Sequence, residues 1–201
     1  MWTLPNILTI SRIGLIPFFL VVFYLPHKYA CYMAAVVFGL AIATDWLDGF
    51  MARKLAQESL FGAFLDPVAD KLMVAVVLIA VLQKQPHIWI AVPVAIIVGR
   101  EIAVSALREW MAQLGQQKKV TVSRLGKWKT GFQMVSLILL IIGPASPMLP
   151  LNYLGVMLLY VACALTLWSM SYYLLAAWPG LVGDSKIILQ KMIECVKSEF
   201  S

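Results

Sequence analysis

Six long apolar runs divide the chain, and they limit the folds open to it more than any other feature. A helix that crosses a bilayer needs about 20 mostly apolar residues. The chain is 62% hydrophobic, whereas ordinary soluble domains are about half apolar. We therefore predict an all-α polytopic membrane protein with six transmembrane helices. The predicted spans cover residues 7–25, 30–50, 67–82, 88–107, 130–144 and 151–176.

The basic residues indicate how these spans are oriented. With six spans, both termini share one side of the membrane with the loops after the second and fourth spans. That side holds all of the 16 lysines and arginines except Lys28 and Lys84. Cytoplasmic loops of membrane proteins carry such an excess of positive charge. The sequence therefore predicts that both termini are cytoplasmic.

The predicted domain organisation is one transmembrane domain with a short tail. Residues 1–178 form the domain, which opens with a short interfacial segment over residues 2–5. No basic residues precede the first apolar run, so we expect no cleavable signal peptide. Residues 179–201 form a cytoplasmic or interfacial tail, in which an amphipathic helix is predicted over residues 186–199.

Four aspartates border the second and third apolar runs at the predicted cytoplasmic face. Asp45 and Asp48 are three residues apart and Asp66 and Asp70 are four apart, so each pair projects from one face of a helix. If the two faces meet, the carboxylates repel one another unless cations bind between them. Oxygen ligands favour Mg²⁺ or Mn²⁺ over zinc. The alternative, that these aspartates are helix caps and surface acids, is less expected, because charges at apolar helices are costly and usually functional.

Residues beside the aspartates are candidates for binding a phosphate-bearing ligand. Gly49 and Gly62 have no side chain, so a ligand could lie against the backbone there. Arg53 could neutralise phosphate oxygens. Pro67 directly follows Asp66 and suits the first turn of a helix, so the third helix is expected to begin near Asp66.

Polar stripes on other apolar runs are predicted to reach the same membrane level. Asn6, Thr9 and Arg12 recur at steps of three residues, which places them on one helix face directed toward the bundle interior. The alternative for Arg12 is that its side chain extends to the lipid headgroups.

The fourth and fifth runs carry basic residues within or at the edge of apolar helix. For Arg100, Arg108 and Lys129, binding of an anionic substrate is favoured over membrane anchoring, because these residues do not lie in loops. Lys129 or Thr130 shares a helical stripe with Gln133 and Ser136.

The spacing of residues 45–70 is Asp-x2-Asp-Gly-x2-Ala-Arg-x8-Gly-x3-Asp-x3-Asp, which resembles the signature of the CDP-alcohol phosphotransferase family at all eight defined positions. The resemblance implies that Asp45, Asp48 and Asp66 are metal ligands. It implies that Asp70 is a metal ligand, the general base, or both. In this family a CDP-linked alcohol is the donor and CMP leaves.

The resemblance extends from the N-terminus through the sixth run, and it is supported by residues 4–12, 44–71, 100–109 and 126–130. It implies a homodimeric enzyme of the bacterial inner membrane that uses two Mg²⁺ or Mn²⁺ ions. The implied reaction transfers phosphatidyl from CDP-diacylglycerol to sn-glycerol 3-phosphate, forming phosphatidylglycerol phosphate and CMP. The residues predicted to bind CDP-diacylglycerol are Asn6, Gly49, Ala52, Arg53 and Gly62.

An acceptor that carries its own phosphate needs a second cationic pocket. The candidates are Arg12, Arg100, Arg108, Lys127 and Lys129. Another family enzyme with a serine or inositol phosphate acceptor is the first alternative, although serine or inositol would need fewer cations. A cation carrier is a remote alternative, since it would place acids toward the bilayer centre or on both sides, and the outer half of this chain has none.

Overall fold

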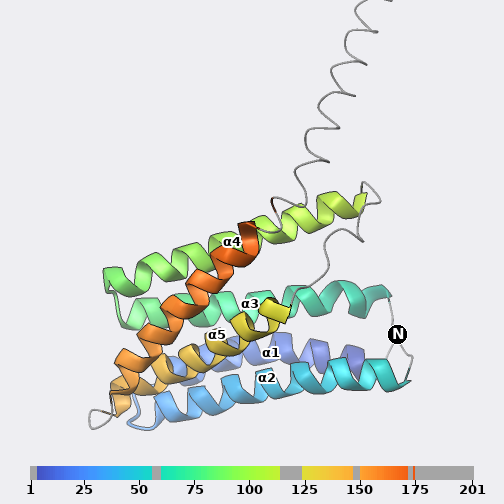
Figure 1. Cartoon of the computed structure of the whole chain (residues 1–201). Coiled ribbons are helices and arrows are strands. Elements are labelled where there is room, and N and C mark those ends of the chain that lie inside the picture. Colours follow the sequence, from blue (N-terminus) through green and yellow to red (C-terminus); the bar gives the residue numbers. More distant parts are fainter. Residues whose placement is uncertain (1–3, 56–59, 114–123, 147–149, 172–173, 175–201) are drawn as a thin grey trace, which may run out of the picture.

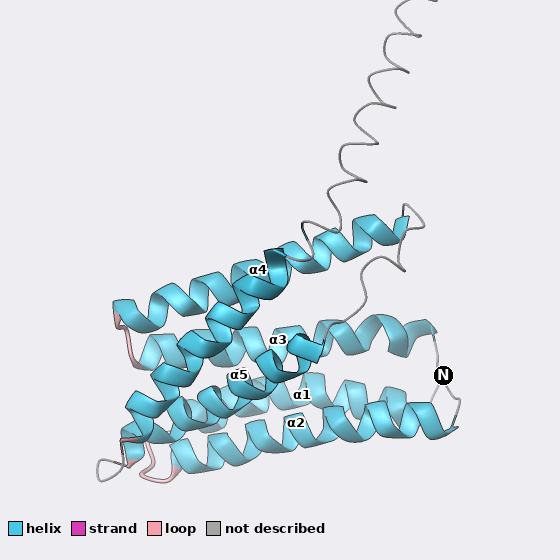
Figure 2. Cartoon of the chain, in the orientation of Figure 1, coloured by secondary structure: helices cyan, strands magenta, loops and turns pink. Residues whose placement is uncertain are grey.

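The computed structural model of the chain describes residues 4–55, 60–113, 124–146, 150–171 and 174. Within these ranges all regular secondary structure is helical, which confirms the prediction of an all-α fold (Figure 2). The helices are α1 (Leu4–Tyr24), α2 (Ala30–Leu55), α3 (Leu60–Lys84), α4 (Ile88–Gln113), α5 (Arg124–Ile142), the short 3-10 helix η2 (Gly143–Ala145) and a helix over Leu151–Ser171, called here the 151–171 helix.

Prolines mark the turns at one end of the bundle. α1 ends at Tyr24, two residues before Pro26, and α3 ends at Lys84, two residues before Pro86. The residue before a proline is disfavoured in helical conformation, so both helices stop there. α5 passes into η2 just before Pro144. The turns predicted between the first two, the third and fourth, and the last two apolar runs are therefore at the expected places.

The helices run back and forth along one common direction, except that the 151–171 helix crosses obliquely. α1 packs on α2 and α3, α5 packs on α2 and α3, and α4 packs on α3. Figure 1 shows the 151–171 helix, in orange, running from the end of α5 toward α4. The start of α1, the end of α2 and the start of α3 lie at the same end of the bundle, opposite the proline turns (Figure 1). This arrangement places the predicted aspartate positions of α2 and α3 in the half of the bundle nearer that end.

Apolar side chains cover both the inside and the outside of the bundle. Inside, the Phe19 ring lies 5.4 Å from the Phe23 ring and 6.3 Å from the Phe38 ring, measured between centroids. Outside, Val21 and Ile102 are 64% and 66% exposed. A helix that is hydrophobic all round belongs in a protein core or a membrane. The exposed apolar faces therefore indicate a membrane protein.

Two described helical segments are long and apolar enough to cross a membrane. They are Ile88–Met111 and Leu151–Ser171, with mean hydropathies of 1.9 and 1.8. Shorter apolar segments cover Ile10–Tyr24, Ala30–Asp45 and Lys129–Ala145. Helices thus occupy all six predicted regions, while the crossing of the membrane by all six stays a prediction. The predicted helix over residues 186–199 lies outside the described residues.

The predicted start of the third helix near Asp66 is wrong. α3 begins at Leu60, so Gly62 and Pro67 both lie inside it. A proline in a helix interior removes one backbone hydrogen bond, but neighbouring groups in membrane bundles can compensate for that loss. The apolar residues Phe61 and Leu65 stand one turn apart ahead of Pro67, and they extend the helical pattern in this direction.

Two side chains at the end of α3 connect it to α1 and α5. Lys84 Nζ donates a hydrogen bond of 3.0 Å to the Phe23 carbonyl and lies 4.2 Å from the centroid of the Phe23 ring. Gln85 Nε2 donates a buried hydrogen bond of 3.0 Å to the Leu140 carbonyl. Both carbonyls belong to the last turn of a helix, where they have no partner within the helix. These contacts fix α1, α3 and α5 relative to one another at the proline-turn end.

The contact between α5 and the 151–171 helix depends on a glycine. Ser136 Oγ donates a hydrogen bond of 2.7 Å to the Gly155 carbonyl, and a Cβ at Gly155 would lie 2.9 Å from Leu140 Cγ. Small residues let neighbouring helices approach closely. We predict that Gly155→Ala lowers the free energy of unfolding by about 1–3 kcal/mol, the usual cost of overpacking. Thermal unfolding of the purified protein in detergent measures this change.

The matched control is Gly39→Ala on α2. A Cβ at Gly39 would have no atom of the described residues within 4 Å. Alanine favours the helix over glycine, so this variant should unfold at the wild-type temperature or slightly above it. If both variants unfold at the wild-type temperature, the tight contact at Gly155 is not present in solution.

Candidate functional site

Two of the four predicted aspartates have described side chains, and they lie at one cavity. Asp45 is near the end of α2, and Asp70 is on α3. Together with Arg12 of α1 they line a cavity of about 20 Å³, which is enough for a particle the size of a water molecule. Three helices therefore bring these polar groups to one point within the bundle.

Arg12 is the buried partner of Asp45. Its guanidinium Nη1 lies 2.8 Å from Asp45 Oδ1, and its side chain is 2% exposed while that of Asp45 is 50% exposed. Arg12 therefore does not extend to the headgroups, and that alternative is wrong. A buried charge is costly unless it is paired, so the ion pair explains how Arg12 is accommodated.

The cavity fits an oxygen-liganded divalent cation in charge and in ligand type. It carries two carboxylates and one guanidinium, and Mg²⁺ or Mn²⁺ prefers carboxylate oxygens. Among the side chains that the structure describes, no three potential metal ligands come together. Asp48 and Asp66 are in α2 and α3, one helical turn from Asp45 and Asp70, but their side chains lie outside the described part of the chain. The full set of four ligands stays a prediction.

A second polar cluster joins α4, α5 and the 151–171 helix. Glu101 Oε1 accepts a hydrogen bond of 3.0 Å from Arg100 Nη1 and a short one from Lys129 Nζ. Arg100 Nη2 donates a hydrogen bond of 3.1 Å to Ser169 Oγ. Arg100 and Lys129 are buried, so neither serves as a membrane anchor in a loop. The cluster carries two cations and one carboxylate, which leaves a net positive charge.

The polar stripe of α5 faces the bundle interior. Lys129, Gln133 and Ser136 are all buried. The Nε atom of Arg100 is buried as well, and it has no hydrogen-bond partner among the described residues. An unsatisfied buried donor costs about 1–3 kcal/mol, so this N–H is placed to donate a hydrogen bond to a ligand oxygen.

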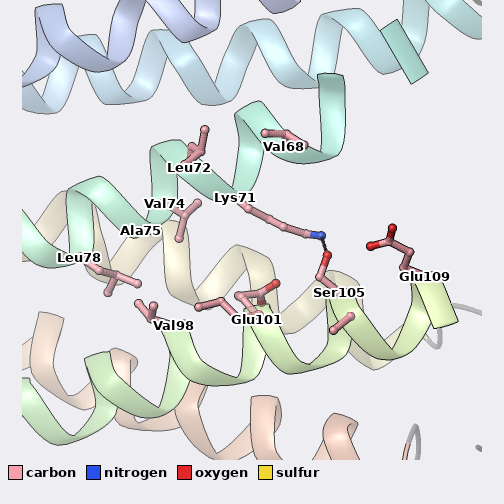
Figure 3. Close-up of a pocket in the computed structure, with 12 residues that line it drawn as sticks. Val68, Lys71, Leu72, Val74, Ala75, Leu78, Val98, Glu101, Ser105 and Glu109 are labelled. Carbon is pink, nitrogen blue, oxygen red and sulfur yellow. Dashed lines mark hydrogen bonds between the residues drawn. The ribbon is translucent and has the colours of Figure 1, made fainter. Parts of the chain in front are cut away.

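A contact between α3 and α4 connects the two polar clusters. Lys71, which directly follows Asp70, donates a short hydrogen bond from Nζ to Ser105 Oγ (Figure 3). Ser105 stands one turn after Glu101 on α4. Asp70 and Glu101 therefore lie on two helices that this hydrogen bond joins directly.

The other predicted site residues are placed only by their helices. Asn6 is in α1, Gly49, Ala52 and Arg53 are in α2, Gly62 is in α3, Arg108 is in α4 and Lys127 is in α5. Their side chains lie outside the described part of the chain, so their binding roles stay predictions.

Sequence reasoning missed the roles of Lys71 and Ser169. Lys71 offered a signal, because a lysine inside an apolar run beside an aspartate is costly without a function or a partner. Ser169 offered none, because single serines are common in membrane helices. Its contact with Arg100 joins residues 69 positions apart in the sequence.

Comparisons with known proteins agree with this picture. The model of the CDP-alcohol phosphatidyltransferase family matches residues 2–168. A Pseudomonas fluorescens protein is 49% identical over 186 residues, which cover 91% of this chain and 94% of the relative. Relatives from Shigella flexneri serotype 5b and Escherichia coli K12 are each 48% identical over 183 residues, 91% of this chain and 99% of the relative. All three relatives bear the name CDP-diacylglycerol--glycerol-3-phosphate 3-phosphatidyltransferase.

Proposed function

This chain belongs to the CDP-alcohol phosphatidyltransferase family, and from that membership we propose that it transfers phosphatidyl from CDP-diacylglycerol to sn-glycerol 3-phosphate. The products are phosphatidylglycerol phosphate and CMP. The observation that carries this proposal is the match of 91% of the chain to relatives whose name states this donor and this acceptor. The two polar clusters supply the groups that the reaction needs.

The cluster at Asp70 serves the chemical step. Asp70 accepts the proton of the primary hydroxyl of glycerol 3-phosphate as the hydroxyl oxygen attacks the phosphorus of the phosphatidyl group. The new P–O bond forms as the bond to the oxygen of CMP breaks. Arg12 holds Asp45 in place through the ion pair. Asp45, Asp48, Asp66 and Asp70 would hold two divalent cations, which neutralise charge on the diphosphate when they are bound.

The cluster at Arg100 binds the phosphate of the acceptor. Arg100 and Lys129 are buried cations whose charge exceeds that of their shared partner Glu101. A phosphate oxygen can accept the hydrogen bond that Arg100 Nε does not make within the described residues. The contact between Lys71 and Ser105 connects this pocket to Asp70, so the acceptor's phosphate and its reacting hydroxyl are served by neighbouring helices. In this assignment Arg108 and Lys127 extend the pocket. Arg12 does not belong to it, because it pairs with Asp45 in the other cluster.

The proposal also covers the membrane location, the topology and the oligomeric state of the enzyme. All six helices cross the bacterial inner membrane, both termini and the active site are cytoplasmic, and the protein forms homodimers. The positive charge collected at one side of the chain supports the orientation. The exposed apolar side chains of the described helices support the bilayer location.

A panel of acceptors tests this function. We expect the purified protein in detergent, with CDP-diacylglycerol and Mg²⁺, to release CMP with sn-glycerol 3-phosphate. Serine and inositol, which carry no phosphate, should give at least about tenfold less, because one missing phosphate contact costs at least the 1.4 kcal/mol that corresponds to a factor of ten. Inositol phosphate, the acceptor of the alternative function, is included in the panel and should also give less release than sn-glycerol 3-phosphate. Chelation by EDTA should stop the release, and added Mg²⁺ or Mn²⁺ should restore it. Release with serine but not with glycerol 3-phosphate would contradict the proposed acceptor.

A further inference from the structure

A single oxygen of Glu101 is shared by two buried cations. Glu101 Oε1 accepts a hydrogen bond of 3.0 Å from Arg100 Nη1 and a short one from Lys129 Nζ. The two cations come from different helices, α4 and α5. Phosphate oxygens accept the same charge-assisted hydrogen bonds from arginine and lysine as carboxylate oxygens do. The carboxylate of Glu101 therefore matches a phosphate group in charge and in the donors that it contacts.

The three side chains differ in how deeply they are buried. Those of Arg100 and Lys129 are each 6% exposed, whereas that of Glu101 is 28% exposed. A buried cation is costly without an anionic partner, so these two need a negative charge whether or not a substrate is bound. Glu101 supplies this charge, and as the most exposed of the three it is the group that can leave.

The carboxylate does not use all the donors of the cluster. Arg100 Nε is buried and has no hydrogen-bond partner among the described residues. Glu101 contacts the cations through one oxygen, whereas the phosphate of a monoester presents three terminal oxygens. A phosphate group can therefore satisfy donors that Glu101 leaves unused.

Glu101 also has room to move. It lines a cavity of about 470 Å³ between α3 and α4, in which Lys71 of α3 donates a hydrogen bond to Ser105 of α4 (Figure 3). Ser105 is one helical turn beyond Glu101, on the same face of α4. The ammonium group of Lys71 thus offers a second cationic partner for a carboxylate displaced into this cavity.

We propose that Glu101 occupies the acceptor's phosphate site between Arg100 and Lys129, and that the acceptor must displace it. This inference rests on the proposed function, because it takes these two cations to be the ones that bind the phosphate of the acceptor. The competition weakens every phosphate-bearing ligand by the same factor. Inorganic phosphate then binds too weakly to block the site, whereas sn-glycerol 3-phosphate has hydroxyl groups for further contacts. Glu101 is therefore a specificity-determining residue.

Binding of inorganic phosphate to Glu101→Gln tests the proposal without turnover. Glutamine keeps the size of the side chain and removes its charge. Thermal unfolding of the purified protein in detergent and EDTA, titrated with phosphate, gives the Kd, because a ligand of the native state raises the unfolding temperature with its concentration. Without phosphate the variant should unfold below the wild-type temperature. Its Kd for phosphate should be about tenfold lower than that of wild type, the effect of one charged hydrogen bond.

Two further variants control the titration, and sodium chloride of equal ionic strength accounts for screening. Glu109→Gln makes the same change at an exposed position of α4 and should keep the wild-type Kd for phosphate. The double variant Glu101→Gln/Lys129→Met should lose the gain in phosphate binding, because one of the two cations is gone. A gain that persists in the double variant would place the phosphate elsewhere and overturn the proposal.

Steady-state kinetics separate competition from support by the sign of the effect. If Glu101 competes with the acceptor, Glu101→Gln should lower both the KM for glycerol 3-phosphate and the Ki for inorganic phosphate about tenfold. If Glu101 only fixes the two cations in place, both constants should rise instead. Unchanged or raised constants would overturn the proposal.

Glu101→Asp provides a second variant that keeps the negative charge and thus the counter-charge of the buried cations. Its side chain is one methylene shorter, so it should contact the two cations less well. We expect the same two constants to fall about two- to fivefold, which corresponds to part of one charged hydrogen bond. A rise in both constants would assign Glu101 a supporting role only, even if Glu101→Gln does not fold.

The failure of this inference and the failure of the proposed function give different results. If the wild-type protein releases CMP only with serine, the proposed function fails, while the phosphate titration still shows whether Glu101 competes with an anion. If glycerol 3-phosphate supports CMP release but phosphate binds Glu101→Gln no better than wild type, the proposed function holds and the role of Glu101 is wrong.

Discussion

Asp70→Asn should reduce CMP release from CDP-diacylglycerol at least about a hundredfold, because removal of a general base costs roughly 100- to 10,000-fold in rate. The asparagine has almost the same shape as the aspartate, so the packing of α3 around the cavity should persist. Binding of CDP-diacylglycerol should therefore largely survive. Steady-state CMP release and equilibrium binding of a labelled donor, measured on the same preparation, separate the two effects.

The matched control for Asp70→Asn is Asp184→Asn, which makes the same change beyond residue 168, where the family match ends. It should leave turnover within about twofold of wild type. Near-normal turnover of Asp70→Asn would remove Asp70 from the role of base. Loss of turnover together with loss of donor binding would assign Asp70 to holding the donor or its cations instead.

Arg100→Met should raise the KM for glycerol 3-phosphate roughly 10- to 100-fold, since a hydrogen bond to a charged group contributes about 1.5–3 kcal/mol and each 1.4 kcal/mol is tenfold. The KM for CDP-diacylglycerol and kcat should change little, because the lost contact is made equally in the ground state and the transition state. Folding should be affected only modestly, because Glu101 keeps its ion pair with Lys129. Initial rates over a matrix of both substrates measure these parameters.

Two further variants serve as comparisons for the effect of Arg100→Met on the KM for glycerol 3-phosphate. Ser169→Ala removes one neutral partner of Arg100 and keeps the charge, so it should raise the same KM only about two- to tenfold. Lys28→Met removes a cation that lies 4.7 Å from the centroid of the Tyr29 ring, away from both clusters, and should leave every parameter near wild type. An unchanged KM for glycerol 3-phosphate in Arg100→Met would place the acceptor's phosphate elsewhere.

Much of the fold could be predicted because apolar runs and proline turns are local signals. The ends of α1 and α3 follow directly from Pro26 and Pro86. The start of α3 was missed because Pro67 fits either the first turn of a helix or the interior of a membrane helix, and only packing decides between them.

The site could be predicted only in part, because its contacts join distant segments. Helical periodicity indicated that Arg12 faces inward, and the structure pairs it with Asp45 of the next helix. Periodicity could not show that Lys129 reaches Glu101, 28 positions away, or that Ser169 reaches Arg100. Such contacts depend on how α5 and the 151–171 helix lie against α4, and no local pattern encodes those angles.

The two polar clusters draw their ionic groups from different helices, which has a consequence for how such enzymes diversify. Arg12, Asp45 and Asp70 belong to α1–α3, whereas Arg100, Glu101 and Lys129 belong to α4 and α5. If the second set binds the acceptor, as we propose, substitutions in it change which alcohol is recognised while the groups proposed to cleave the nucleotide anhydride are inherited intact. A duplicated copy of this gene could therefore acquire a new headgroup product through a few changes in its second half.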